Sequence, residues 1–198
     1  MAFLYNKLTN RIILTLIVLW GTISFWFSIT GSITVYTIIL LSILSVVLIF
    51  LEKGSIFILI YSSFLVSFAL YNFLYQYSLP YWLVMIIILS VFSYLFYFTE
   101  QKIGILGNKR LIYLVLFSLI TLEIFFVLNY FIVSPLSKSL IISVISYVFV
   151  GFCYSVLAKH QSNNIKTYLL VSIGLIALVF ASSIWGGDIW LFGVFSLY

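Results

Sequence analysis

Long apolar runs alternate with short polar segments along the whole chain. Seven runs can be distinguished, at residues 12–29, 33–51, 55–75, 81–98, 111–133, 138–158 and 167–185. An α-helix rises about 1.5 Å per residue, so a run of roughly 20 residues is long enough to cross the hydrocarbon core of a bilayer. The pattern therefore predicts seven transmembrane helices joined by short loops.

The fold class follows from the same runs. Only helices satisfy their own backbone hydrogen bonds in lipid, and the runs are too long and too uniformly apolar to be the strands of a barrel. We therefore expect an all-α, polytopic integral membrane helix bundle. The short connections leave no room for a separate soluble domain, so residues 1–198 are predicted to form a single transmembrane domain.

The composition agrees with this interpretation. The chain is 65% hydrophobic and 7% charged, with a mean hydropathy of +1.32. Such a chain cannot remove its apolar side chains from water by folding as a soluble globule. The first run could be mistaken for a signal peptide, but it exceeds a typical apolar signal region and no small-residue cleavage site follows it. We expect it to be retained as the first helix.

The segment after the seventh run has a different character. Residues 188–198 are too short to cross a bilayer, yet most of them are apolar. Asp188 can cap a short helix after the break at Gly186-Gly187, and Trp185 and Trp190 suit the membrane interface. We expect a short C-terminal interfacial helix on the outer face.

Basic residues are distributed unevenly between the two sides that alternating spans define. Only Lys138 would lie on one side. The others would share the opposite side: Lys7, Arg11, Lys53, Lys102, Lys109, Arg110, Lys159 and Lys166. The positive-inside rule then predicts a cytoplasmic N-terminus and, with seven spans, an external C-terminus.

The charge also indicates which partners to expect. The net charge of +5 is scattered over the loops rather than gathered into one face. Anionic lipid headgroups at the cytoplasmic face are therefore the expected partner, rather than nucleic acid. The excess of lysine over arginine, together with plentiful isoleucine, phenylalanine and asparagine, is typical of an AT-rich prokaryotic genome. We expect the cell membrane of a bacterium or an archaeon.

One acidic residue lies deep inside a predicted span. Glu123 is near the middle of 111–133, where a charged carboxylate is costly. We expect its carboxyl to be protonated, to face the bundle interior and to bond a polar group of another span, because the spans offer no interior lysine or arginine. A helical wheel places Leu116, Leu119, Ile120, Val127 and Tyr130 on the same face. Asn129 and Tyr130 complete the candidate polar site.

Two further sets of residues are candidates for binding or packing. In the sixth span, small residues recur every four positions around Tyr147: Ser139, Ser143, Gly151 and Ser155. Such a column favours close helix packing, within the bundle or between copies, and a substrate-lining face is the alternative. The second set forms a dense aromatic patch around the third loop: Tyr71, Tyr75, Tyr77, Tyr81 and Trp82. We interpret it as an interfacial belt, with an outward-opening ligand pocket as the alternative.

Motifs for catalysis or metal binding were not found. The single cysteine, Cys153, excludes an intramolecular disulfide and multi-cysteine metal sites, and the single histidine, His160, excludes a bis-histidine haem site. The four carboxylates lie far apart in the sequence. No cofactor or metal is expected, and the chain is not expected to be an enzyme.

Three hypotheses for function follow. The first is a membrane-embedded accessory, scaffold or binding subunit, whose partner is another membrane protein or a second copy of the chain. The second is a small carrier of a lipid or a proton-coupled solute that uses Glu123. The third is a membrane enzyme. Interior prolines that would interrupt the helices are absent from the spans, which favours the scaffold over the carrier.

Overall fold

The protein is all-helical in a computed structural model that describes residues 2–28, 32–104, 109–131, 133–157, 170, 172–175 and 177. Six long helices fall in the described ranges: α1 (Ala2–Ser28), α2 (Ser32–Leu51), α3 (Ser55–Tyr77), α4 (Tyr81–Ile103), α5 (Arg110–Asn129) and α6 (Pro135–Leu157). Each contains a segment long and apolar enough to cross a membrane, which confirms a helical membrane bundle. Residues 170, 172–175 and 177, from the predicted seventh span, are helical. The rest of that span and the tail 188–198 lie outside the described residues.

Local sequence signals set several helix ends. Ser134 accepts a hydrogen bond from the backbone N–H of Ser137 at 3.2 Å, and Pro135 occupies the first position of α6, where a missing N–H costs nothing. Pro80 is the N-cap residue of α4, in an extended conformation. Gly104 ends α4 with φ +69°, a left-handed conformation that suits glycine. These short motifs fix where the chain turns between helices.

The end of α2 is less usual. Glu52 itself adopts the left-handed conformation, with φ +57°, where a non-glycine residue costs about 1–2 kcal/mol. The N–H of Lys53 closes the turn by donating to the carbonyl of Leu48 at 3.1 Å. This turn directs the Glu52 carboxylate toward two cations on α1 and α4.

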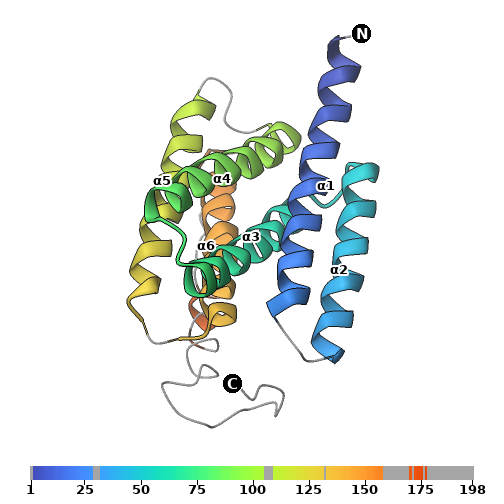
Figure 1. Cartoon of the computed structure of the whole chain (residues 1–198). Coiled ribbons are helices and arrows are strands. Elements are labelled where there is room, and N and C mark those ends of the chain that lie inside the picture. The colour runs from blue at the N-terminus through green and yellow to red at the C-terminus, as the bar shows by residue number, and fades with distance from the viewer. Residues whose placement is uncertain are drawn as a thin grey trace.

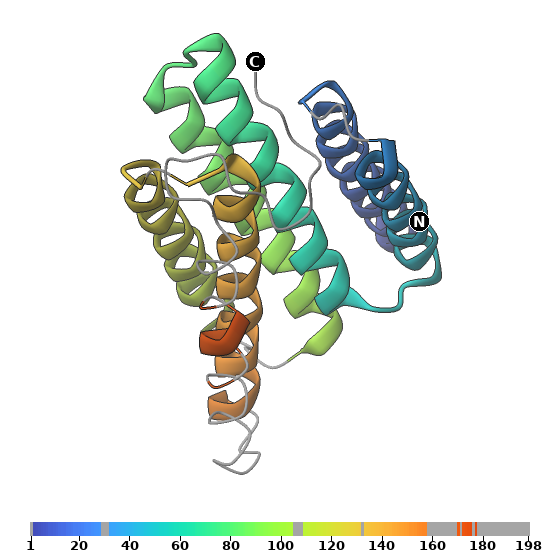
Figure 2. The ribbon, with the colours of Figure 1, turned by 90° about the horizontal axis from the view of Figure 1, so that it is seen from below.

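The bundle is built around α3. Its apolar segment is 72% buried, against 33% for α5 and 17% for α2. On one side α3 belongs to a ring of four helices in the order α3–α4–α5–α6, and on the other side it packs with α1 and α2. Figure 2 shows α1 and α2 on one side of α3 and the other helices on the opposite side, and Figure 1 shows the same arrangement from the side.

Aromatic rings fill the centre of the four-helix ring. Phe96 of α4, Phe117 of α5 and Phe149 of α6 meet with centroid distances of 4.9, 5.4 and 5.1 Å. All three side chains are buried. Offset and edge-to-face ring pairs of this kind add to the packing that holds helices together in lipid.

A close backbone contact and a chain of hydroxyls attach α1 and α2 to α3. A Cβ atom placed on Gly21 of α1 would lie 2.6 Å from the Cβ of Leu65 on α3. Nearby, the hydroxyls of Thr22 and Ser42 lie 2.6 Å apart, and the Ser42 hydroxyl lies 2.8 Å from the Tyr61 hydroxyl. The absence of a side chain at residue 21 thus allows α1 to approach α3 closely.

We expect Gly21→Ala to lower the free energy of unfolding by about 1–3 kcal/mol, because the added methyl must push α1 away from α3. Thermal unfolding in detergent, followed by tryptophan fluorescence, measures the effect. Gly174→Ala is the matched control, since no described atom lies within 4 Å of the position its Cβ would take. Equal melting temperatures for the two variants would contradict the close contact.

Candidate functional site

The position of Glu123 corrects the sequence expectation. The helical wheel groups the residues correctly, but this face of α5 points outward: Glu123 is exposed, and Phe117, Thr121 and Phe125 form the buried face. No described residue hydrogen-bonds to the carboxyl. The predicted inward orientation of Glu123 was wrong because α5 is apolar all round, so its sequence pattern does not distinguish a protein-facing side from a lipid-facing side.

Glu123 interrupts an otherwise apolar stripe on α5. The exposed side chains above and below it are Ile112 (65% exposed), Leu116 (43%), Leu119 (49%), Val127 (49%) and Tyr130 (88%). Glu123 lies six positions before the last residue of α5, which places it about 9 Å from that end of the helix. A carboxyl group is therefore presented outward at a depth where hydrocarbon is the expected solvent.

The other two candidate residues beside Glu123 have separate environments. Tyr130 follows α5 and lies on the stripe. Asn129 instead accepts a hydrogen bond at 3.1 Å from the Tyr75 hydroxyl of α3. The three residues therefore do not form one site.

A lysine completes the cluster around Tyr75. Lys138, in the first turn of α6, is 1% exposed, and its ammonium donates to the Tyr75 hydroxyl. The ammonium also lies 5.5 Å from the ring centre of Tyr71 and 5.0 Å from that of Tyr75, within cation–π range. Lys138, Tyr75 and Asn129 thus join α6, α3 and α5 at one end of the bundle, in what we term the lysine cluster.

The lysine cluster corrects the expectation that Lys138 is a loop charge, because its side chain is buried within the protein at the end of the bundle. The sequence placed Lys138 at the edge of the sixth span as a loop charge, although it was already singular as the only basic residue assigned to its side. Its burial depends on tyrosines far away in the sequence: Tyr75, for example, precedes Lys138 by 63 residues. Spacing along α6 alone could not reveal them.

The structure divides the aromatic patch. Tyr71 is fully buried, stacks on Phe125 at 4.1 Å and donates to its backbone carbonyl at 2.9 Å. The other members are at least half exposed: Tyr75, Tyr77, Tyr81 and Trp82. Tyr75 belongs to the lysine cluster and Tyr71 packs beneath its ammonium, whereas the remaining rings have the exposure of an interfacial belt.

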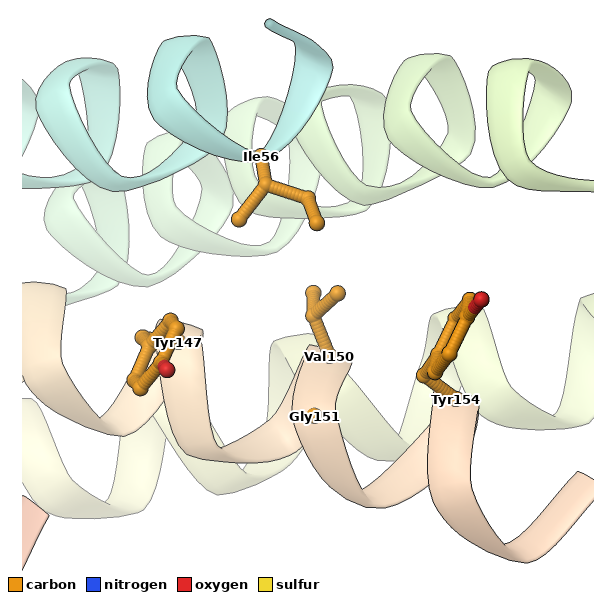
Figure 3. Close-up of a pocket in the computed structure, with 5 residues that line it drawn as sticks. All are labelled: Ile56, Tyr147, Val150, Gly151 and Tyr154. Carbon is orange, nitrogen blue, oxygen red and sulfur yellow. The ribbon is translucent and has the colours of Figure 1, made fainter. Parts of the chain in front are cut away.

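The column of small residues on α6 also divides. Ser139 and Ser143 are buried, and each donates to a carbonyl of its own helix at 2.7 Å. Further along α6, Gly151 lines a cavity of about 310 Å³. The remaining lining residues are Ile56, Tyr147, Val150 and Tyr154, and Figure 3 shows the two tyrosines on either side of Val150 and Gly151 with Ile56 opposite. The side chain of Ser155 lies outside the described residues.

Ion pairs gather at the opposite end of the bundle from the lysine cluster. Glu52 pairs with Arg11 and, at 2.8 Å, with Lys102, so that one carboxylate joins α1, α2 and α4. Glu100, with its side chain 3% exposed, pairs with Arg110 and joins α4 to α5. Both carboxylates are thus engaged with cations. Among the described residues, no three His, Cys, Asp or Glu side chains form a group that could hold a metal ion.

We expect the lysine cluster to show coupling between its members. Tyr75→Phe removes the oxygen that accepts a hydrogen bond from the buried ammonium, and it should lower the free energy of unfolding by about 1–3 kcal/mol. Lys138→Met removes the charge but keeps the volume of the side chain, so its effect on stability should be small. In the Lys138→Met background, Tyr75→Phe should therefore cost clearly less. Equilibrium unfolding in mixed micelles gives this double-mutant cycle, with the exposed Tyr77→Phe as control. Strict additivity would show that the ammonium does not depend on Tyr75.

Fold and site together define an all-α membrane bundle with a buried lysine cluster at one end and, on an outward-facing helix, an acidic group to which no described residue hydrogen-bonds. Neither the known protein families, nor curated proteins, nor solved structures include a match to the chain.

Proposed function

We propose that the protein is a multi-pass membrane subunit that binds a transmembrane helix of a partner along the Glu123 stripe of α5, and so acts as an accessory or scaffold subunit. The observation that carries the proposal is the exposed carboxyl within an apolar stripe. In hydrocarbon an isolated carboxyl lacks the hydrogen bonds that water would supply, and a hydrogen-bonding group on a neighbouring helix restores them. A helix of a partner protein can supply the hydrogen-bonding group that lipid lacks.

The carrier hypothesis receives less support. A carrier that uses Glu123 needs a hydrated route to it between its own helices. Glu123 faces away from those helices, and the cavity between α3 and α6 is lined by other residues. The proposal assigns no catalytic role to the described residues.

The proposed topology has seven spans, a cytoplasmic N-terminus, anionic headgroups at the cytoplasmic face and an interfacial helix after the last span, in the cell membrane of a bacterium or an archaeon. Its support is the grouping of Arg11, Lys102 and Arg110 at one end of the bundle. In a Cys153→Ser background, a cysteine at Ser78 should react with an impermeant maleimide in intact cells, whereas one at Lys109 should react only after permeabilisation. The reverse pattern would refute the orientation.

Photo-crosslinking in native membranes tests the binding of a helix. A photoreactive residue at Leu116, Leu119 or Val127 should give an adduct of one defined mass, whereas the same residue at Leu40 of α2, which is 66% exposed, should give none. Glu123→Leu should reduce the adduct at Leu119, and Glu123→Gln should retain it, because an amide still donates and accepts hydrogen bonds. Equal adducts at Leu119 and Leu40, or none at any stripe position, would refute the proposal.

A further inference from the structure

The exposed residues of the stripe lie on one face along the whole of α5. From Ile112 through Leu116, Leu119, Glu123 and Val127 to Tyr130 the intervals are three or four residues. All six side chains are exposed. The intervals average about 3.6 residues, the period of an α-helix, so the stripe presents one face to a neighbouring helix along its full length. The stripe thus forms a continuous seam in which Glu123 is the only ionisable group at depth.

Membrane insertion constrains which helix can align with this seam. All copies of one chain insert with the same orientation, so the α5 helices of two copies related by a two-fold axis along the membrane normal run parallel, with equal residues at equal depth. Glu123 of one copy then meets Glu123 of the other. For a second copy, the matching depth of the two carboxyls thus follows from the sequence of this chain alone.

The carboxyl group is chemically suited to meet its own copy. A protonated carboxyl has one O–H donor and a carbonyl acceptor, so two such groups can exchange a reciprocal pair of hydrogen bonds. A single polar group on an apolar seam also fixes the register of two helices, because any sliding leaves it unpaired in hydrocarbon. Tyr130, 88% exposed at the end of the same seam, would lie beside its counterpart near the membrane interface.

We propose that the helix bound at the Glu123 stripe is α5 of a second copy of this chain, so that the protein is a parallel homodimer with the two Glu123 carboxyls hydrogen-bonded across the axis. This inference rests on the proposed function and names its partner. The charged end of the bundle does not oppose the pairing, because Arg110, the first residue of α5, is already paired with Glu100 of its own chain.

Purified full-length protein reconstituted in bilayers at low protein density provides the test, because no other protein is present. In a Cys153→Ser background, single cysteines at Leu116 and Leu119 should form disulfide-linked dimers on mild oxidation, and a cysteine at Leu40 should not. Energy transfer between differently labelled copies should show that Glu123→Leu weakens dimerisation about tenfold, whereas Glu123→Gln changes it little. Glu123 contacts none of the described residues through a hydrogen bond, so both variants should keep the melting temperature of the wild-type monomer.

Leu119→Trp is a second variant that leaves the carboxyl intact and obstructs the seam by bulk, and it should also dissociate the dimer. Oxidation that links Leu40 as readily as Leu119, or dimerisation indifferent to both Glu123→Leu and Leu119→Trp, would overturn the homodimer. If the pure protein gives no dimer while native membranes still yield a defined adduct at Leu119, the partner is a different chain and the proposed function stands. If neither preparation yields an adduct at the stripe, both proposals fail.

Discussion

Arg110→Met is expected to lower the free energy of unfolding by about 3–5 kcal/mol, because it removes a cation that pairs with a buried carboxylate. The guanidinium of Arg110 pairs with Glu100, whose side chain is only 3% exposed, and lies 5.6 Å from the ring of Tyr97. The substitution keeps the length of the side chain while it removes the charge. Denaturation in mixed micelles measures the change.

The two partners of the Arg110–Glu100 ion pair differ in burial, and the control variants use this difference. Arg110 is partly exposed, with 35% of its side chain accessible, so Glu100→Gln leaves a cation that solvent can still reach and should cost less than Arg110→Met. Combining both substitutions should recover much of the stability lost in Arg110→Met. Lys109→Met, one residue earlier and exposed, should be nearly neutral. A loss of stability at Lys109 equal to that at Arg110 would show that the loop, rather than the ion pair, is responsible.

Tyr71→Ala should be comparably damaging, at about 3–5 kcal/mol, because it empties a fully buried aromatic site. The ring stacks on Phe125 at 4.1 Å, and the ammonium of Lys138 lies over it. Tyr71→Phe keeps the ring and loses only the hydrogen bond to the carbonyl of Phe125, for about 1 kcal/mol. The same mixed-micelle titration separates the two variants.

Tyr77→Ala is the matched control for Tyr71→Ala. Both residues belong to the aromatic patch that the sequence indicates, but Tyr77 is 68% exposed. A small change at residue 77 beside a large one at residue 71 would show that the patch combines a packed core ring with surface rings. Similar losses at both positions would mean that the outer rings also pack against the bundle.

The positions of the described helices follow closely from sequence, because hydropathy responds directly to the length of an apolar run. The turns are also predictable, since Pro80 and Ser134-Pro135 carry their own conformational preferences. Helix ends are not. The first predicted span starts at residue 12, whereas α1 starts at Ala2, and the fifth was predicted to reach residue 133, whereas α5 ends at Asn129. Hydropathy reports which residues suit lipid and is insensitive to backbone geometry at the membrane edge.

Orientation of the helices about their own axes could not be predicted. Lipid is as apolar as the interior of the bundle, so a span such as α5 carries little record of which face is buried. The same ambiguity led to the expectation that Glu123 of α5 faces the bundle interior, while the most buried helix is α3, which has no ionisable residue apart from its tyrosines. For Lys138 the missing information was tertiary, because its burial depends on Tyr71 and Tyr75 of that central helix.

The ion pairs of Glu52 have a consequence for synthesis of the chain. Arg11 lies in α1 and Glu52 directly follows α2, so both are available as soon as α2 has left the ribosome, whereas Lys102 follows 50 residues after Glu52. At about 5–20 residues per second, Lys102 emerges roughly 2.5–10 s later. During that interval the first helical hairpin can enter the membrane with Arg11 already neutralised by Glu52. The later arrival of α4 then attaches the growing bundle to a preformed carboxylate.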